Sequence, residues 1–155
     1  MTLTLTSSAF THNGSIPRQY TCDDADAAPS LEWSGAPVGT KSFALIVDDP
    51  DAPDPKAPKM TYVHWVMYDL AATTQRLDGG KTPAGARDGL NDWKKTGYGG
   101  PCPPIGRHRY FHKLYALDVM LEGLRTPTKQ QLEKAMAGHV LAQAELIGTY
   151  QKTKR

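Results

Sequence analysis

The chain has 155 residues, of which 39% are hydrophobic and 22% charged, and its formal net charge is +2. These values predict a globular protein, which we place in one domain over residues 1–155, and exclude an intrinsically disordered chain. No stretch approaches the roughly eighteen consecutive apolar residues of a membrane-spanning helix. The first residues show no basic region followed by a long apolar run, so we expect no signal peptide and a cytoplasmic location.

Charge is distributed unevenly along the chain. Residues 1–54 contain eight acidic and two basic residues, whereas residues 55–155 contain sixteen basic and eight acidic residues. The basic residues do not cluster with interleaved aromatic residues, so we expect no nucleic-acid partner. Cys22 and Cys102 are far apart in sequence, and in a reducing compartment we expect them to be free thiols.

Five apolar stretches predict β-strands, bounded by glycine, proline and polar residues. They are residues 3–6, 31–33, 42–47, 62–70 and 109–120. Because side chains alternate along a strand, Tyr62, His64, Val66 and Tyr68 are expected to share one face. Residues 48–55 hold three prolines and four aspartates, a composition that predicts a stiff polar loop after the third stretch. Asp23, Asp24 and Asp26 are expected to be solvated, since they lack the later Gly and Glu of a calcium loop.

A single helix is predicted at the end of the chain. Thr128 and Gln131 have the spacing of a capping box, and apolar residues follow at helical spacing from Leu132 to Ile147. Gly148 is then expected to end the helix. The fold class predicted from these elements is mainly β, a sandwich of short strands with a C-terminal α-helix. The apolar side of this helix is expected to pack on the core, and a homodimer contact through it is the alternative.

Residues 97–110 form the stretch of greatest chemical interest. Four glycines and three prolines in its first ten residues predict a stiff loop that presents His108 and Tyr110 at the start of a strand. If these side chains meet Asp49, Asp51 and His64, the result is a site suited to a small anion. Imidazole and backbone N–H groups would donate to phosphate oxygens, while the carboxylates orient the imidazoles.

Other interpretations of the same residues remain open. His64 alone is more often a core histidine, and Asp-Pro repeats are usually turns. His108 and His112 share strand parity, so two histidines and a carboxylate could hold iron or zinc. Cys102 near His108 could form a nucleophilic pair, although a semi-buried thiol is the preferred interpretation. We expect no catalytic residue, no metal ligand and no cofactor.

Three motifs together resemble the signature regions of the phosphatidylethanolamine-binding protein (PEBP) family, in particular its bacterial, Raf-kinase-inhibitor-like branch. They are residues 48–53, residues 62–65 and residues 97–110, and weaker likenesses extend over most of the chain. The resemblance implies a β-sandwich-like fold with an anion pocket at one end. Asp49, His64, His108 and Tyr110 would line this pocket, Asp51 and Pro53 would shape its first loop, and Pro101 its second. It also suggests a cis peptide bond before Pro53.

The resemblance implies a binding protein for a small anion or a phospholipid headgroup. We therefore predict a non-enzymatic regulatory or inhibitor-type module, with Tyr110 donating at the rim of the pocket. One alternative is a protease or kinase inhibitor that acts through protein contacts. The other is a small hydrolase or isomerase that uses Asp49, His64 and His108 for acid–base chemistry. The terminal helix differs from that of eukaryotic members, so their kinase contacts are not carried over.

Overall fold

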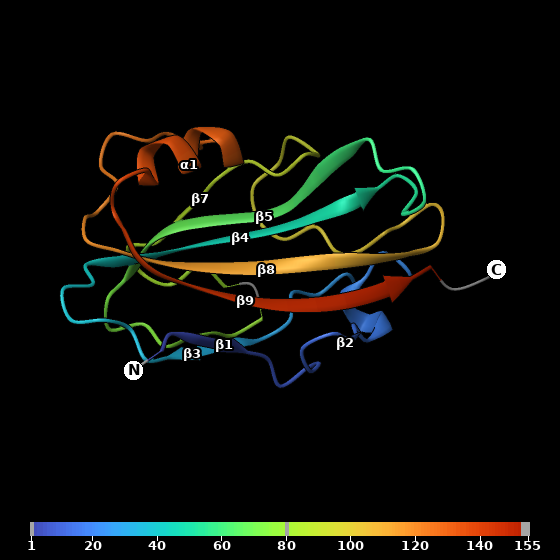
Figure 1. The fold of residues 1–155 in the computed structure, drawn as a ribbon, viewed down its shortest axis with the longest axis horizontal. Coiled ribbons are helices and arrows are strands. Elements are labelled where there is room, and N and C mark those ends of the chain that lie inside the picture. The colour runs from blue at the N-terminus through green and yellow to red at the C-terminus, as the bar shows by residue number, and fades with distance from the viewer. Residues whose placement is uncertain (1, 80, 153–155) are drawn as a thin grey trace.

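The computed structural model describes residues 2–79 and 81–152, and its strands form two sheets (Figure 1). The smaller sheet has the order β1-β3-β6, with β1 at Thr4–Thr6, β3 at Leu31–Ser34 and β6 at Arg76–Leu77. The larger sheet has the order β2-β9-β8-β4-β5-β7. Its strands are β2 (Gly14–Ser15), β4 (Ser42–Ala52), β5 (Met60–Ala71), β7 (Arg87–Asp88), β8 (Arg107–Leu117) and β9 (Val140–Gln151). A 3₁₀ turn, η1, covers Arg18–Tyr20, and helix α1 covers Lys129–Met136.

The large sheet is buried on both faces. Phe43, Leu45 and Trp65 pack with Leu31 and Trp33 of the small sheet in one core. On the other face, a second core joins residues of the large sheet to Leu132 and Met136 of α1, which lies opposite β1 and β3 in Figure 1. Burial on both faces explains why the central strands are nearly continuous apolar runs. The predicted mainly β fold is thereby confirmed.

The predicted C-terminal helix is much shorter than expected. Its capping box is present, since Gln131 N–H donates to the Thr128 hydroxyl and Thr128 N–H donates to the Gln131 side chain. The helix ends at Met136, and Gly138 adopts a φ of +83°, a conformation typical of a residue just past a helix end. The following residues form β9, which pairs antiparallel along the whole of β8. The extension of the helix to residue 147 was therefore wrong, as was the expectation that all strands are short.

The predicted loop at 48–55 begins later than expected, because β4 continues to Ala52. Asp48 and Asp49 still pair with Val63 and Tyr62 of β5, and a register shift then takes Pro50 out of the pairing. Proline is tolerated there because an irregular position needs no N–H donor from it. The acidic residues that follow the apolar run are thus part of the sheet.

A bulge in β5 changes the direction of the His64 side chain. Val47 pairs with Trp65, whereas the next residue of β4, Asp48, pairs with Val63. His64 is therefore one extra residue, and the alternation of faces breaks there. Tyr62 and His64 point to one side, while Val66 and Tyr68 belong to the core beneath α1. The predicted common face of these four residues was wrong beyond His64.

Two expectations for the N-terminal half were also wrong. Cys22 and Cys102 form a disulfide, with their Cα atoms 5.4 Å apart, because the fold brings together residues separated by 80 positions. Asp23 is buried and accepts a hydrogen bond from the Tyr150 hydroxyl at 2.6 Å. The expectation was wrong for Asp23 only, since Asp24 and Asp26 are exposed, although the Asp26 side chain also accepts the N–H of Gly100. No helix in the described ranges is long and apolar enough to cross a membrane.

Candidate ligand-binding site

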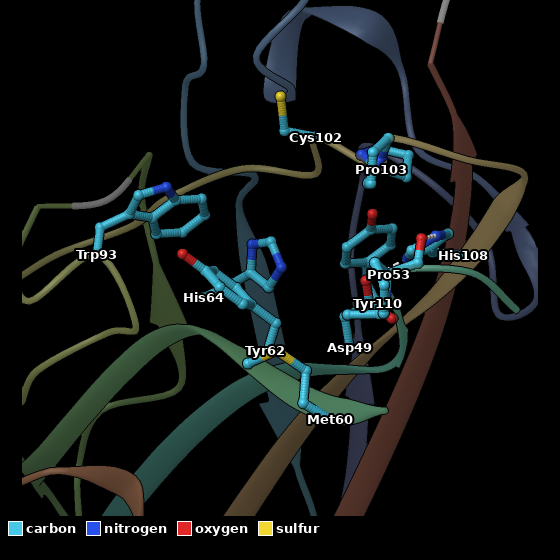
Figure 2. A pocket seen from close by; sticks show the side chains of 12 residues that line it. Asp49, Pro53, Met60, Tyr62, His64, Trp93, Cys102, Pro103, His108 and Tyr110 are labelled. Carbon is cyan, nitrogen blue, oxygen red and sulfur yellow. Dashed lines mark hydrogen bonds and ion pairs between the residues drawn. The ribbon is translucent and has the colours of Figure 1, made fainter. Parts of the chain in front are cut away.

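A cavity of about 330 Å³, hereafter the first cavity, lies at the end of the large sheet where β4 ends and β5 and β8 begin. Figure 2 shows Tyr62, His64 and Trp93 on one side and Asp49, His108 and Tyr110 on the other. The full lining is Asp49, Ala52, Pro53, Met60, Tyr62, His64, Trp93, Cys102, Pro103, Pro104, His108 and Tyr110. Aromatic rings and prolines make up most of it, and it includes no lysine or arginine.

His108 is fully buried, and both of its ring nitrogens have partners within the protein. Nδ1 is 2.6 Å from Asp49 Oδ2, and Nε2 is 2.8 Å from the carbonyl oxygen of Ile105 and 3.1 Å from that of Pro53. Carbonyl oxygens only accept, so Nε2 must carry a hydrogen, and a second hydrogen lies between Nδ1 and the carboxylate. The His108–Asp49 pair is therefore an internally neutral unit.

Both oxygens of Asp49 accept a hydrogen bond, because the second oxygen, Oδ1, accepts the N–H of Asp51 at 2.7 Å. The three bonds around His108 and the two around Asp49 fix the start of β8 against the cis peptide bond between Ala52 and Pro53. Such a saturated buried network stiffens the wall of the cavity. It leaves His108 no unpaired N–H group to offer to a ligand.

His64 differs from His108 in the hydrogen bonding of its two ring nitrogens. Its Nδ1–H donates to the Gly99 carbonyl oxygen at 2.7 Å, the backbone of Gly100 makes a weaker interaction with the ring, and the hydrogen bonds of the described residues include none to Nε2. The ring is 4% exposed and makes edge contacts with Tyr62, Trp93 and Tyr110. Burial lowers the pKa of His64, and its hydrogen bond to Gly99 opposes this only in part. His64 is thus a neutral ring whose Nε2 can accept a hydrogen bond, or donate one after taking up a proton.

Tyr110 does not lie at the rim, as predicted, but deep in the wall. Its ring stacks on that of His108 at 6.3 Å, and its buried hydroxyl has no hydrogen-bond partner in the part of the chain that is described. Burial, reinforced by the nearby Asp49, raises the pKa of Tyr110, so the phenol stays protonated. A protonated phenol can act as a donor if a ligand reaches it.

Two predicted site residues lie outside the lining of the first cavity. The Asp51 carboxylate accepts the backbone N–H, the Nε–H and an Nη–H of Arg109 at 2.8 to 3.0 Å, which draws it away from the cavity. Pro101 lines a neighbouring narrow space, and its carbonyl oxygen accepts the Cys22 N–H. The other predicted residues, Asp49, Pro53, His64, His108 and Tyr110, are brought together as lining residues.

The sequence analysis missed several lining residues. Tyr62 could have been found from its parity with His64, and Pro103 and Pro104 from their place in the glycine- and proline-rich stretch. Met60 and Trp93 gave no local signal, because each is brought to the cavity by the tertiary fold. Trp93 is held by its N–H bond to the Asn91 side chain and by close contact with Gly99, which has no side chain to displace it.

The metal and nucleophile alternatives find no matching geometry in the ranges that the structure describes. No group of three His, Cys, Asp or Glu side chains there is arranged to hold a metal ion. His112 is buried away from the first cavity, with its Nδ1 facing the carbonyl oxygens of Tyr110 and Leu146. Cys102 lines the cavity but is oxidised, so it has no thiolate to act as a nucleophile.

Comparison with known proteins shows the family and the fold to which the chain is related. A family model described as "Phosphatidylethanolamine-binding protein" matches residues 6–151. A UPF0098 protein of Methanothermobacter thermautotrophicus is 43% identical over 155 residues, covering 97% of this chain and 99% of the relative. The crystal structure of a PEBP homologue of Chlamydia trachomatis, CT736, matches with a TM-score of 0.91 at 41% identity, covering 98% of this chain and 99% of that one. Escherichia coli YbcL, described as a member of the mammalian PEBP family, matches with a TM-score of 0.87 at 30% identity, covering 99% and 100%.

The two packed sheets, with a cavity at one end of the larger sheet, define a β-sandwich protein. With the family model covering most of its length, the chain belongs to the phosphatidylethanolamine-binding protein family. The resemblance stated from its three motifs is confirmed, including the likeness to microbial members. Members of this family are known to bind phospholipid-like ligands, and the names of the UPF0098 relatives state no function.

Proposed function

We propose that the protein is a non-enzymatic binding module for small phosphate esters, either free phosphomonoesters or phospholipid headgroups, held in the first cavity. The observation that carries the proposal is the contrast between the two imidazoles. Both nitrogens of His108 are hydrogen-bonded to protein groups, whereas Nε2 of His64, a ring on the cavity wall, has no hydrogen bond among the described residues. The ligand's acidic oxygen would therefore meet His64, and the phenol of Tyr110 would be a second donor.

Because His64 is neutral, binding of a phosphate ester at its Nε2 requires one proton, carried either by the ester or by the His64 ring. A neutral His64 accepts a hydrogen bond from the P–OH of a monoanionic phosphate, or it becomes an imidazolium that donates to a dianion or a diester. In both cases the complex contains one proton more than an unbound neutral His64 and an unbound, fully ionised ester contain together. Since the second pKa of a phosphate monoester is about 6, binding should weaken as pH rises above that value.

The hydrogen bonds of His108 also support a binding role over acid–base catalysis. A general base needs a lone pair within reach of the substrate. The Nε2 of His108 instead carries a hydrogen that points at two carbonyl oxygens. Protein-inhibitor activity remains an alternative for which the cavity gives no specific support.

The test is calorimetric titration of the full chain with glycerol 3-phosphate at pH 6 and pH 8. We expect roughly fiftyfold weaker binding at pH 8, because the singly protonated form of the ester falls from about one half to about one hundredth of the total over this range. His64→Ala should abolish binding, while His139→Ala, far from the cavity, should bind like wild type. Equal affinity at the two pH values, or unchanged binding by His64→Ala, would overturn the proposal.

A further inference from the structure

A second cavity, of about 320 Å³, adjoins the first and is equally large. The two share Trp93 and Cys102 as lining residues. The second is more polar in composition, and its full lining is Cys22, Asp26, Asn91, Trp93, Lys95, Thr96, Tyr98, Gly99, Gly100 and Cys102. Nothing in the function proposed above uses it.

The wall between the cavities is thin. The carbonyl oxygen of Gly99 bonds His64 on the side of the first cavity, and the N–H of Gly100 bonds Asp26 on the side of the second. These two groups belong to the same peptide unit. A Cβ added to Gly99 would lie 2.2 Å from the Trp93 ring, and one added to Gly100 would lie 2.2 Å from Asp26 Oδ1. Two side-chain-free residues are thus what allows His64, Trp93 and Asp26 to approach one peptide.

Opposite charges line the second cavity without neutralising each other. Lys95 and Asp26 both contribute to its wall, yet they form no ion pair with one another or with any other described residue. The backbone of Lys95, an exposed residue, is positioned by the buried Asn91, whose Oδ1 accepts the Lys95 N–H at 3.2 Å and whose backbone N–H donates to the Lys95 carbonyl at 2.9 Å. Asp26 is positioned by Gly100. A cation and an anion that line one cavity without forming an ion pair with each other complement a ligand that carries both charges.

We propose that the second cavity binds a small zwitterionic group, with its ammonium at Asp26 and its carboxylate at Lys95. Resting on the proposed function, this makes the two cavities one bipartite site for a serine phosphate ester. The phosphate lies at His64, and the amino-acid end passes over Trp93 into the second cavity. Asp26 is an exposed residue, but partial desolvation of its carboxylate still raises its pKa despite the hydrogen bond from Gly100, and a bound ammonium would offset that cost.

The zwitterion distinguishes between sources of phosphoserine. In a phosphorylated protein, the amine and the carboxylate of the serine form peptide bonds and carry no charge. A phosphopeptide therefore lacks the zwitterionic group that the second cavity is proposed to bind. Free O-phospho-L-serine and the phosphoserine headgroup of a lipid both retain it. Glycerophosphoserine, a water-soluble diester, represents the lipid headgroup in the test.

The test compares four ligands by calorimetry at pH 6: O-phospho-L-serine, glycerophosphoserine, phosphoethanolamine and glycerol 3-phosphate. Wild type should bind phosphoserine about fivefold tighter than phosphoethanolamine, which lacks the carboxylate, and phosphoethanolamine about fivefold tighter than glycerol 3-phosphate. Lys95→Ala should remove the preference for phosphoserine over phosphoethanolamine. Asp26→Asn should remove the preference for phosphoethanolamine over glycerol 3-phosphate. Lys94→Ala, a neighbouring lysine outside the lining, is the matched control and should keep both.

The outcomes separate this inference from the function on which it rests. If glycerol 3-phosphate binds but phosphoserine binds no tighter, or if Lys94→Ala and Lys95→Ala behave alike, the bipartite site is overturned and the phosphate site stands. If no ester binds, both proposals fail. Tighter binding of glycerophosphoserine than of free phosphoserine would identify the lipid headgroup as the source, and the reverse order would identify the free metabolite.

Discussion

His64 and Asp26 bind opposite ends of a single peptide group, the one between Gly99 and Gly100. The ring of His64 donates to the carbonyl oxygen of Gly99 at 2.7 Å, and the backbone N–H of Gly100 donates to Asp26 Oδ1 at 2.9 Å. A peptide that is hydrogen-bonded at both ends is more strongly polarised than one bonded at a single end. A change of charge on His64 or Asp26 therefore alters the strength of the hydrogen bond at the other end of this peptide group. The two cavities are thus coupled electrostatically as well as lying next to each other.

The first prediction concerns this shared wall. In Gly100→Ala the new methyl group would lie 2.2 Å from Asp26 Oδ1 and 2.4 Å from the Tyr20 carbonyl oxygen, and the backbone cannot easily give way. We expect a loss of about 1–3 kcal/mol in the free energy of unfolding, as for overpacked cores. In Gly99→Ala the methyl group meets the half-exposed Trp93 ring, which can move. Urea denaturation should show a smaller loss there, with altered tryptophan fluorescence; equal stability of Gly100→Ala and wild type would contradict the assignment of the wall.

The second prediction concerns the Cys22–Cys102 disulfide, which closes a loop of 80 positions. Removing such a link restores conformational freedom to the unfolded chain, so Cys22→Ser with Cys102→Ser should lose about 2–5 kcal/mol. Dithiothreitol should destabilise wild type by a similar amount and leave the double variant unchanged. Thiol titration of denatured protein purified without reductant should find no free thiol. Two reactive thiols in that sample would show that the bridge is absent.

Local patterns predicted those parts of the fold that depend on local physics. The apolar runs in β4, β5 and β8 are recognisable because both faces of these strands are buried, and Thr128 begins α1 through a bond to a residue three positions away. The segment 140–151 could not be assigned in this way. Its apolar spacing from Val140 to Ile147 fits a helix as well as a strand, and the decision is made by pairing with β8, a partner more than twenty positions distant.

In the candidate site, too, some features follow from local sequence and others depend on tertiary contacts. Asp49, His64, His108 and Tyr110 were identified because their motifs are specific, and the fold gathers them at one cavity. Their individual roles could not be predicted, because they depend on tertiary neighbours. His108 is saturated by carbonyl oxygens of Ile105 and Pro53, and the bulge that turns His64 toward the cavity is a property of the β4–β5 register. Likewise, sequence spacing says nothing about the distance between two cysteines.

The third prediction concerns Asp51 and Arg109. The hydrogen bonds from the Arg109 guanidinium hold the pKa of Asp51 below its ordinary value. A carboxylate with a lowered folded pKa stabilises the protein above its unfolded pKa, near 3.9, and loses that contribution as pH falls below it. Asp51→Asn should therefore flatten the fall in stability below about pH 4, measured by thermal unfolding. It should bind glycerol 3-phosphate like wild type at pH 6, because the carboxylate faces Arg109; a large loss of affinity would return Asp51 to the binding site.

The last prediction concerns His112, which is buried with its Nδ1 against two carbonyl oxygens and its Nε2 without a described partner. Burial lowers the pKa of His112 to about 4, whereas in the unfolded chain it is near 6.5. The unfolded state therefore binds the proton first as pH falls, and folding loses roughly 3 kcal/mol between pH 7 and pH 4 from this group. His64, whose pKa burial also lowers, adds a loss of the same sign. Urea midpoints measured across this range should fall steeply for wild type and less steeply for His112→Asn, whose amide does not titrate; parallel curves for the two proteins would show that His112 does not titrate as a buried neutral ring.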